Sequence, residues 1–261
     1  MADPINATTR RDIEKRLAAL EVEEGVRVLF AVESGSRAWG FPSPDSDYDV
    51  RFVYRRPRDW YLSLRPGRDV VERPITDEID LNGWDVRKAL GLMLKSNAVV
   101  SEWLASPIRY RPDDPMVARL ADLADRSFDP RGLAHHYASL GYNAVKRWVE
   151  GAKEVPVKRY FYVLRPALAL RALRLAPGVR PPMELGALMA ASDLPPATVG
   201  LIEDLVARKR EAREQDYTRR PAELDRLVLE ELGRAEDVPA RKLTPEVWAA
   251  ANRFFLDVVN Q

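Results

Sequence analysis

The sequence predicts an α+β protein: a small mixed β-sheet with flanking helices, followed by a helical domain. Short apolar runs separated by turn-forming residues fill positions 26–81, a pattern typical of strands. From Asp85 onward, apolar residues recur at helical spacing. Because the strands precede most of the helices instead of alternating with them, the two kinds of element are expected to segregate. We therefore expect a first domain over residues 1–125 and a helical domain over residues 126–261.

Three segments are predicted to build the sheet. Residues 26–32 form an apolar run of β-branched and aromatic type, which predicts a buried strand. Residues 48–54 predict a second strand, whose side chains alternate between a core face and a polar face. Residues 70–71 and 75–81 predict a strand pair, or one bent strand, interrupted at Pro74.

Helices are predicted before and after the sheet. Residues 9–20 predict a leading amphipathic helix with a threonine cap, and residues 57–66 predict a surface connection with one helical turn. Pro166 predicts a kink or a new start inside a later helix. The helices expected after the sheet begin with one through Arg87, Leu90 and Leu94 and continue over 101–104, 116–124, 130–151, 157–175, 183–191, 197–215, 222–232 and 245–259.

The turn after the first strand carries small polar residues. Gly35 permits backbone angles that are closed to other residues and lets a ligand approach the main chain. Backbone N–H groups of such a turn, together with the Ser36 hydroxyl, can bind phosphate oxygens. Arg37 can add charge-assisted hydrogen bonds to the same oxygens. We interpret this segment as a candidate phosphate-binding turn.

Two aspartates follow at the start of the second strand. Asp47 and Asp49 share one face with Arg51, because alternate residues of a strand point the same way. Two neighbouring carboxylates repel each other unless a cation lies between them. Hard oxygen ligands at this spacing suit Mg²⁺, with Mn²⁺ as an alternative, and Mg²⁺ takes the rest of its coordination from waters and substrate phosphates. Two such ions could stabilise the attacking and leaving oxygens of a phosphoryl or nucleotidyl transfer.

Each of these features also has an ordinary structural explanation. A Gly-Ser turn is usually only a turn, and an Asp-x-Asp pair is usually solvated or caps a helix. Their order is more specific: a strand, Gly-Ser, a spacer of turn residues, and then Asp-hydrophobic-Asp-hydrophobic on a strand. We interpret the combined pattern as catalytic.

In this pattern the chain resembles the DNA polymerase β-like nucleotidyltransferase superfamily, with Gly35-Ser36, Asp47, Tyr48, Asp49 and Val50 at the characteristic positions. Within that superfamily it is most similar to the predicted bacterial and phage nucleotidyltransferases linked to RNA repair, which are associated with RNA ligases. The segments that carry this closer resemblance are residues 35–40, 46–51, 83–90, 95–97, 102–104, 106–108 and 160–166.

The resemblance implies a third carboxylate on a neighbouring strand and a nucleotide-binding cleft between two domains. Asp80 is expected to be this third metal-facing group, where it can help to deprotonate the incoming hydroxyl. Glu78 shares the same strand face and remains an alternative. Asp85 is a second alternative, although its position at a helix start favours a capping role.

The helical domain should contribute basic and aromatic side chains to such a cleft. Lys158, Tyr162 and Arg165 fall at i, i+4 and i+7 of the helix over 157–175 and share one face. The two cations could bind a triphosphate, and the tyrosine could stack on a base. A solvated cationic face is the alternative, and it is also expected for charge runs such as Lys209-Arg210.

These observations predict a Mg²⁺-dependent nucleotidyltransferase that moves a nucleoside monophosphate from a triphosphate such as ATP to an acceptor hydroxyl or phosphate and releases pyrophosphate. By resemblance, the acceptor is an RNA end in RNA repair or processing, and an RNA ligase is a pathway partner. A protein hydroxyl, as in nucleotidylating antitoxins, and a small molecule remain alternative acceptors. A nucleotide- or RNA-binding module is the alternative outside the enzymes, which the retention of both strand aspartates disfavours.

Composition excludes several other classes. The 41 basic and 40 acidic side chains nearly cancel, so no global charge marks a nucleic-acid binder, although a local patch is allowed. The chain has no cysteine, which excludes disulfides and cysteine-metal sites. Its two histidines, His135 and His136, are adjacent and therefore poor joint ligands, and so small a number of histidines disfavours a Ser-His-Asp hydrolase. The sequence contains no apolar stretch of membrane-spanning length and no signal-peptide pattern, so we expect a cytoplasmic protein that does not contact a membrane.

Overall fold

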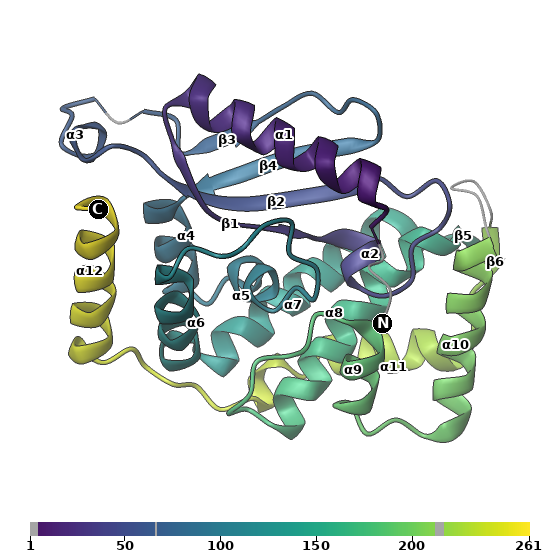
Figure 1. Ribbon diagram of the computed structural model, residues 1–261. Helices are drawn as coiled ribbons and strands as arrows, with labels where there is room; N and C mark the ends of the chain where they lie inside the picture. Colours follow the sequence, from purple (N-terminus) through teal and green to yellow (C-terminus); the bar gives the residue numbers. More distant parts are fainter. Residues whose placement is uncertain (1–4, 66, 212–216) are drawn as a thin grey trace.

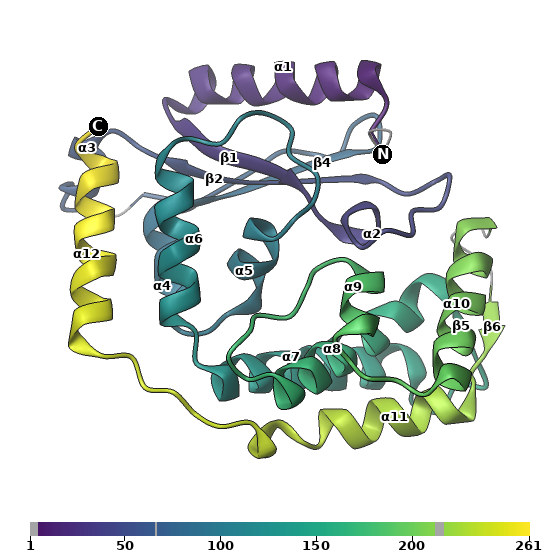
Figure 2. The same cartoon turned by 60° about the horizontal axis from the view of Figure 1, so that its bottom comes forward.

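The computed structural model describes residues 5–65, 67–211 and 217–261. A small sheet with helices on both faces lies beside a larger assembly of helices (Figure 1). One face of the sheet is covered by α1 (Ala7–Glu24), and the other by α4 (Val86–Met93), α5 (Ala98–Leu104) and α6 (Met116–Ser127) (Figure 2). This arrangement confirms the predicted α+β class with a small mixed sheet.

The mixed sheet has the strand order β1-β2-β4-β3. Its strands are β1 (Arg27–Glu33), β2 (Tyr48–Arg55), β3 (Val70–Glu72) and β4 (Ile79–Asp85). β2 is antiparallel to β1 and parallel to β4, whereas β3 is antiparallel to β4. In the parallel pairing Asp49 is the register partner of Asp80. Because side chains at paired positions leave the same face of a sheet, these two carboxylates lie side by side.

The observed β4 differs from the strand expected over 75–81. It begins at Ile79 because Asp77 and Glu78 have left-handed backbone angles, with φ of 52° and 62°, which are incompatible with an extended strand. It then continues to Asp85, where α4 begins. The residues expected to start the strand therefore form the turn that precedes it.

The helical assembly consists of α7 (Pro130–Ala144), α8 (Val157–Leu175), α9 (Leu185–Ala190), α10 (Pro196–Glu211) and α11 (Ala222–Leu232). In place of the single helix expected over 130–151, the α-helix ends at Ala144. The chain then continues as a π-helical turn, Val145–Val149. α8 runs through Pro166 without interruption, so the expectation of a new helix start at this residue is wrong. Positions 212–215 of the helix expected over 197–215 lie outside the described residues.

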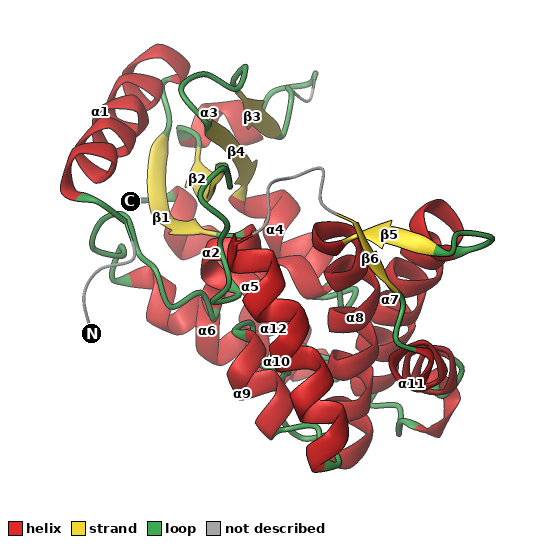
Figure 3. Ribbon diagram, turned by 90° about the vertical axis from the view of Figure 1, so that its right-hand side faces the viewer, coloured by secondary structure: helices red, strands yellow, loops and turns green. Residues whose placement is uncertain are grey.

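Several short elements add to the predicted pattern. The segment Gly35–Ala38 forms one helical turn, α2, and Arg58–Tyr61 forms α3 within the expected surface connection, of which residue 66 lies outside the described residues. A two-stranded ribbon of β5 (Glu154–Pro156) and β6 (Tyr217–Arg219) lies apart from the main sheet (Figure 3), and β5 contacts α8 and the π-helical turn. The leading helix is capped by Asn6 and not by a threonine.

The last helix, α12 (Pro245–Val259), returns to the sheet side of the molecule (Figure 2). Ala251, Phe254 and Val258 are buried in the same core as α4 and α6. The other large core surrounds α8, whose side chains are buried along most of its length. The first half of the chain is therefore completed by a segment from its end. No helix in the described ranges is both long enough and apolar enough to cross a bilayer.

The contact between β4 and β2 predicts a stability effect at Gly83. A Cβ atom at this position would lie 2.0 Å from Cε2 of the buried Phe52. Gly83→Ala is therefore expected to lower the free energy of unfolding by about 1–3 kcal/mol, because the core must overpack. Urea denaturation measures the change.

Gly91→Ala is the matched control, because an added Cβ on this α4 residue meets no heavy atom within 4 Å. It is expected to raise the free energy of unfolding by about 1 kcal/mol or less through helix propensity. A Gly83→Ala protein as stable as Gly91→Ala would contradict the proposed packing.

Candidate active site

Asp47 and Asp49 line one small cavity where the sheet meets the helical assembly. Asp47 lies just before β2, and Asp49 is the second residue of this strand. The cavity has a volume of about 80 Å³. We call it the aspartate cavity, and its lining consists of Ser36, Trp39, Phe41, Asp47, Asp49, Lys158, Tyr162 and Lys209. Residues of α2, β2, α8 and α10, which are far apart in the sequence, therefore meet at one place.

The turn at Gly35 brings the backbone against the Asp49 carboxylate. A Cβ atom on Gly35 would lie 2.0 Å from Oδ2 of Asp49, and the φ angle of 59° also favours glycine. The backbone N–H of Ser34 donates to the backbone oxygen of Asp49 at 2.8 Å. The Ser36 hydroxyl donates to Ser46 Oγ at 3.1 Å. The predicted phosphate-binding turn is thus fixed next to the predicted metal ligand.

Arg37 lies along the loop that precedes β2 and does not line the aspartate cavity. Its Nη2 donates to the backbone oxygen of Ser46 at 2.6 Å. Its guanidinium group stacks on the Tyr48 ring, 3.9 Å from the centroid. These contacts hold the loop that carries Asp47.

Asp80 lies beside Asp49, and Arg51 bridges the two carboxylates. Nη2 of Arg51 donates to Asp49 Oδ1 at 2.8 Å and to Asp80 Oδ2 at 2.7 Å. Nη1 of Arg51 donates to the backbone oxygen of Asp80 at 3.0 Å. Asp80 does not line the aspartate cavity, so it is joined to the site through Arg51.

The two alternatives for the third carboxylate lie elsewhere. Glu78 is exposed and belongs to the left-handed turn before β4. Asp85 ends β4 and caps α4, where its side chain accepts from the backbone N–H of Arg87 at 2.8 Å and from the Tyr61 hydroxyl at 2.7 Å. The capping role favoured by the sequence is confirmed for Asp85.

A buried carboxyl group that sequence analysis missed lies behind Asp49. Glu33, the last residue of β1, is fully buried, and its Oε1 accepts from the backbone N–H of Asp49 at 3.1 Å. Its Oε2 accepts a hydrogen bond from the Tyr110 hydroxyl. Burial raises the pKa of Glu33 to about 8, against an opposing effect of these hydrogen bonds. The sequence gives little indication that Glu33 is buried, because this residue only follows the apolar run of the first strand.

The charges around the aspartate cavity act on the pKa of Asp49 in opposite directions. Burial raises the pKa of Asp49, and the negative charges of Asp80 and Asp47 also raise it, whereas Arg51 and Lys158 lower it. An added positive charge would therefore stabilise the ionised form of Asp49.

Within residues 5–65, 67–211 and 217–261, no three His, Cys, Asp or Glu side chains are already arranged to hold a metal ion. Mg²⁺ commonly binds through one or two carboxylates and completes its coordination with waters and substrate phosphates. The pair Asp47 and Asp49, beside the Ser36 hydroxyl, fits this type of site. The donor set therefore suits a metal–triphosphate complex better than an ion bound by protein alone.

The helical assembly supplies two lysines to the aspartate cavity. Lys158 lies in the first turn of α8, as expected, and Lys209 reaches the cavity from α10. Lys209 is buried and donates a hydrogen bond to Ser43 Oγ, so its expected place on a solvated face is wrong. The signal was present: Ile202, Leu205 and Lys209 share one helical stripe, and all three are buried.

Tyr162 and Arg165 both contact the ring of Trp39. Tyr162 lines the aspartate cavity and meets the Trp39 ring edge to face, with 5.5 Å between centroids. Arg165 is buried, stacks on Trp39 at 4.1 Å from the centroid, and donates to the backbone oxygen of Met183 at 2.8 Å. It lines a neighbouring pocket and not the aspartate cavity.

The family model identifies the chain as a nucleotidyltransferase-like protein of the polymerase beta type. The chain belongs to the RNA repair pathway DNA polymerase beta family, whose sequence model matches residues 9–257. This membership confirms the resemblance found in the sequence.

The chain also matches two individual proteins. The uncharacterized protein YcgL of Bacillus subtilis strain 168 is 38% identical over 256 residues, which cover 97% of each chain. The crystal structure of a nucleotidyltransferase-like protein from Exiguobacterium sibiricum 255-15 matches with a TM-score of 0.33 and 12% identity, covering 94% of this chain and 79% of the other.

The pH dependence of folding tests the buried Glu33. Its pKa is about 8 in the folded protein against an ordinary value of 4.5. The neutral group therefore contributes stability that is complete below about pH 4.5 and is lost as the pH rises through about 8. Glu33→Gln, which cannot ionise, is expected to lose less unfolding free energy between about pH 5 and pH 8 than the wild type, measured by urea denaturation with EDTA present.

Glu14→Gln, on the exposed side of α1, provides the control and should follow the wild-type curve. If the Glu33→Gln and wild-type curves run parallel over this range, the assigned environment of Glu33 is wrong.

Proposed function

We propose that this protein is a Mg²⁺-dependent nucleotidyltransferase that transfers a nucleoside monophosphate from a nucleoside triphosphate to the end of an RNA. The observation that carries the proposal is the joint lining of one cavity by Asp47, Asp49, Lys158 and Lys209. Carboxylates suit the metal and lysines suit the phosphates, so the cavity meets both needs of a metal–triphosphate complex. Membership of an RNA repair family supports RNA as the acceptor.

The proposed reaction forms one bond and breaks another at the α-phosphorus. An acceptor oxygen, from a hydroxyl or a phosphate, bonds to the α-phosphorus, and the bond from this phosphorus to the bridging oxygen breaks, so that pyrophosphate leaves. When bound, Mg²⁺ or Mn²⁺ would neutralise charge on the phosphate oxygens. Asp47 and Asp49 would hold the metal. Asp80, which Arg51 joins to Asp49, is assigned to complete the site from the neighbouring strand.

The phosphates of the triphosphate are assigned to the turn and to the lysines. The Gly35 backbone and the Ser36 hydroxyl lie next to Asp49 and would bind phosphate oxygens from the sheet side. Lys158 and Lys209 would bind them from the helical side. Binding from both sides would orient the α-phosphorus toward the acceptor.

The double variant Asp47→Asn/Asp49→Asn tests the catalytic assignment. It removes both anionic metal ligands at nearly constant size, so transfer should fall by more than about a hundredfold. The measurement incubates the protein with each labelled triphosphate, Mg²⁺ and a mixture of RNAs, and follows label in the RNA and release of pyrophosphate.

Asp204→Asn, an exposed aspartate on α10, is the control for this variant and should retain full transfer. Equal transfer by the wild type and the double variant would remove the assigned site. If the label is found on protein and not on RNA, the acceptor is a protein hydroxyl and not an RNA end.

Lys209→Gln tests whether the helical assembly contributes to triphosphate binding. Loss of a charged hydrogen bond to phosphate is expected to lower kcat/KM for the triphosphate by about tenfold to a hundredfold. Lys242→Gln, at an exposed position, is expected to leave kcat/KM unchanged. An unchanged kcat/KM in a folded Lys209→Gln protein would exclude Lys209 from the triphosphate site.

A further inference from the structure

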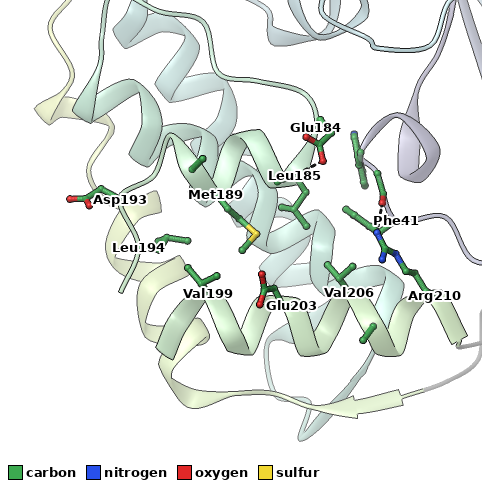
Figure 4. A pocket seen from close by; sticks show the side chains of 15 residues that line it. Phe41, Glu184, Leu185, Met189, Asp193, Leu194, Val199, Glu203, Val206 and Arg210 are labelled. Carbon is green, nitrogen blue, oxygen red and sulfur yellow. Dashed lines mark hydrogen bonds between the residues drawn. The ribbon is translucent and has the colours of Figure 1, made fainter. Parts of the chain in front are cut away.

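Trp39 lines two larger pockets in addition to the aspartate cavity. The first has a volume of about 750 Å³ and lies between α9 and α10, where Met189 and Glu203 point toward each other (Figure 4). The second has a volume of about 380 Å³ and lies between α8 and the C-terminal part of α7 with its π-helical turn. Tyr162 lines both this second pocket and the aspartate cavity, so the two are adjacent.

The two larger pockets have opposite charge. The 750 Å³ pocket carries Glu184, Asp193 and Glu203 against Arg210, and we call it the acidic pocket. The 380 Å³ pocket carries three arginines against Glu102, and we call it the arginine pocket. A polyanionic strand is repelled by the first and attracted by the second.

Aromatic rings and guanidinium groups alternate along the arginine pocket. The Arg159 guanidinium lies 4.3 Å from the Trp148 centroid and 5.8 Å from the Tyr162 centroid. Arg147 stacks on Trp148 at 4.7 Å. The series continues through Tyr162 and Trp39 to the wall of the aspartate cavity. Both kinds of planar group are platforms on which bases of a single-stranded nucleic acid stack.

Two further features distinguish the arginine pocket. Nε1 of Trp39 and Nε of Arg165, a residue that is 6% exposed, are buried without a hydrogen-bond acceptor in the described structure. Buried donors are normally paired, so these two donors are unusual among the residues that line the pocket. In addition, Arg147 and Trp148 belong to the π-helical turn Val145–Val149, and such turns are rare and frequent at functional sites.

From this arrangement we propose that the arginine pocket binds the terminal nucleotides of a single-stranded RNA acceptor. The bases stack among Trp148, Arg159 and Tyr162, and the arginines contact the backbone phosphates. The reacting end then lies next to Tyr162 at the wall of the aspartate cavity. This inference rests on the proposed function, since it specifies the acceptor for that transfer.

Binding of a short fluorescently labelled single-stranded oligoribonucleotide, followed by fluorescence anisotropy, tests this inference. Trp148→Ala is expected to weaken binding by about tenfold, because a stacking surface is lost, and Trp148→Phe is expected to retain most of the affinity. Arg159→Gln should reduce the steepness of log K against log salt concentration by about 0.7, the value for one contact to a single strand.

The matched controls are on α12, far along the chain from the arginine pocket. Trp248→Ala removes an exposed tryptophan, and Arg253→Gln removes an exposed arginine, so both are expected to bind as the wild type does. Thermal unfolding is measured for each protein. If Trp148→Ala does not fold, Trp148→Phe and the salt dependence of Arg159→Gln decide the result.

The outcomes separate this inference from the proposed function, because oligonucleotide binding requires no triphosphate. Binding that is equal in Trp148→Ala and wild type, or no binding by the wild type, overturns the inference even where nucleotidyl transfer is observed. Binding that falls with Trp148→Ala supports the pocket even where the wild type transfers no nucleotide. Label transferred to a protein acceptor without oligonucleotide affinity also overturns the inference.

Discussion

The packing of the Asp49 carboxylate against the Gly35 backbone is the contact on which the site depends. The glycine has no Cβ, so the carboxylate can lie against the turn that would bind phosphate. Glu33 supports the same aspartate from behind by accepting its backbone N–H. Arg51 supports it from the side by bridging to Asp80. A half-buried carboxylate is held here at an energetic cost, and that cost falls when a cation approaches.

The second half of the chain turns this group of carboxylates into an enclosed cavity. α8 and α10 bring Lys158 and Lys209 to the aspartates, and Trp39 separates the cavity from two larger pockets of opposite charge. The return of α12 to the core beneath the sheet links the end of the chain to the first half. The proposed metal ligands and the two lysines thus come from different halves of the chain, so relative movement of the halves would change the distance between them.

The strong periodic patterns predicted most of the fold. The strands near 26–32 and 48–54 and the helices over 157–175, 222–232 and 245–259 agree with the structure, because their apolar spacing reflects burial. The start of β4 was misplaced because left-handed angles at Asp77 and Glu78 leave no pattern in the sequence. The motif in the sequence also predicted that Asp47, Asp49 and Gly35 lie close together, as the structure shows. Glu33 was missed because it is a charged residue buried by distant tertiary contacts. Lys209 was assigned to a solvated charge run although it shares a buried helical stripe with Ile202 and Leu205.

The most direct test of the account is calorimetric titration of a non-hydrolysable nucleoside triphosphate with and without Mg²⁺. The account predicts saturable binding with Mg²⁺ and binding weaker by about tenfold or more in EDTA, because the aspartates repel bare phosphates while the metal joins them. Equal affinity under both conditions would contradict the claim that the aspartate cavity is a metal–triphosphate site.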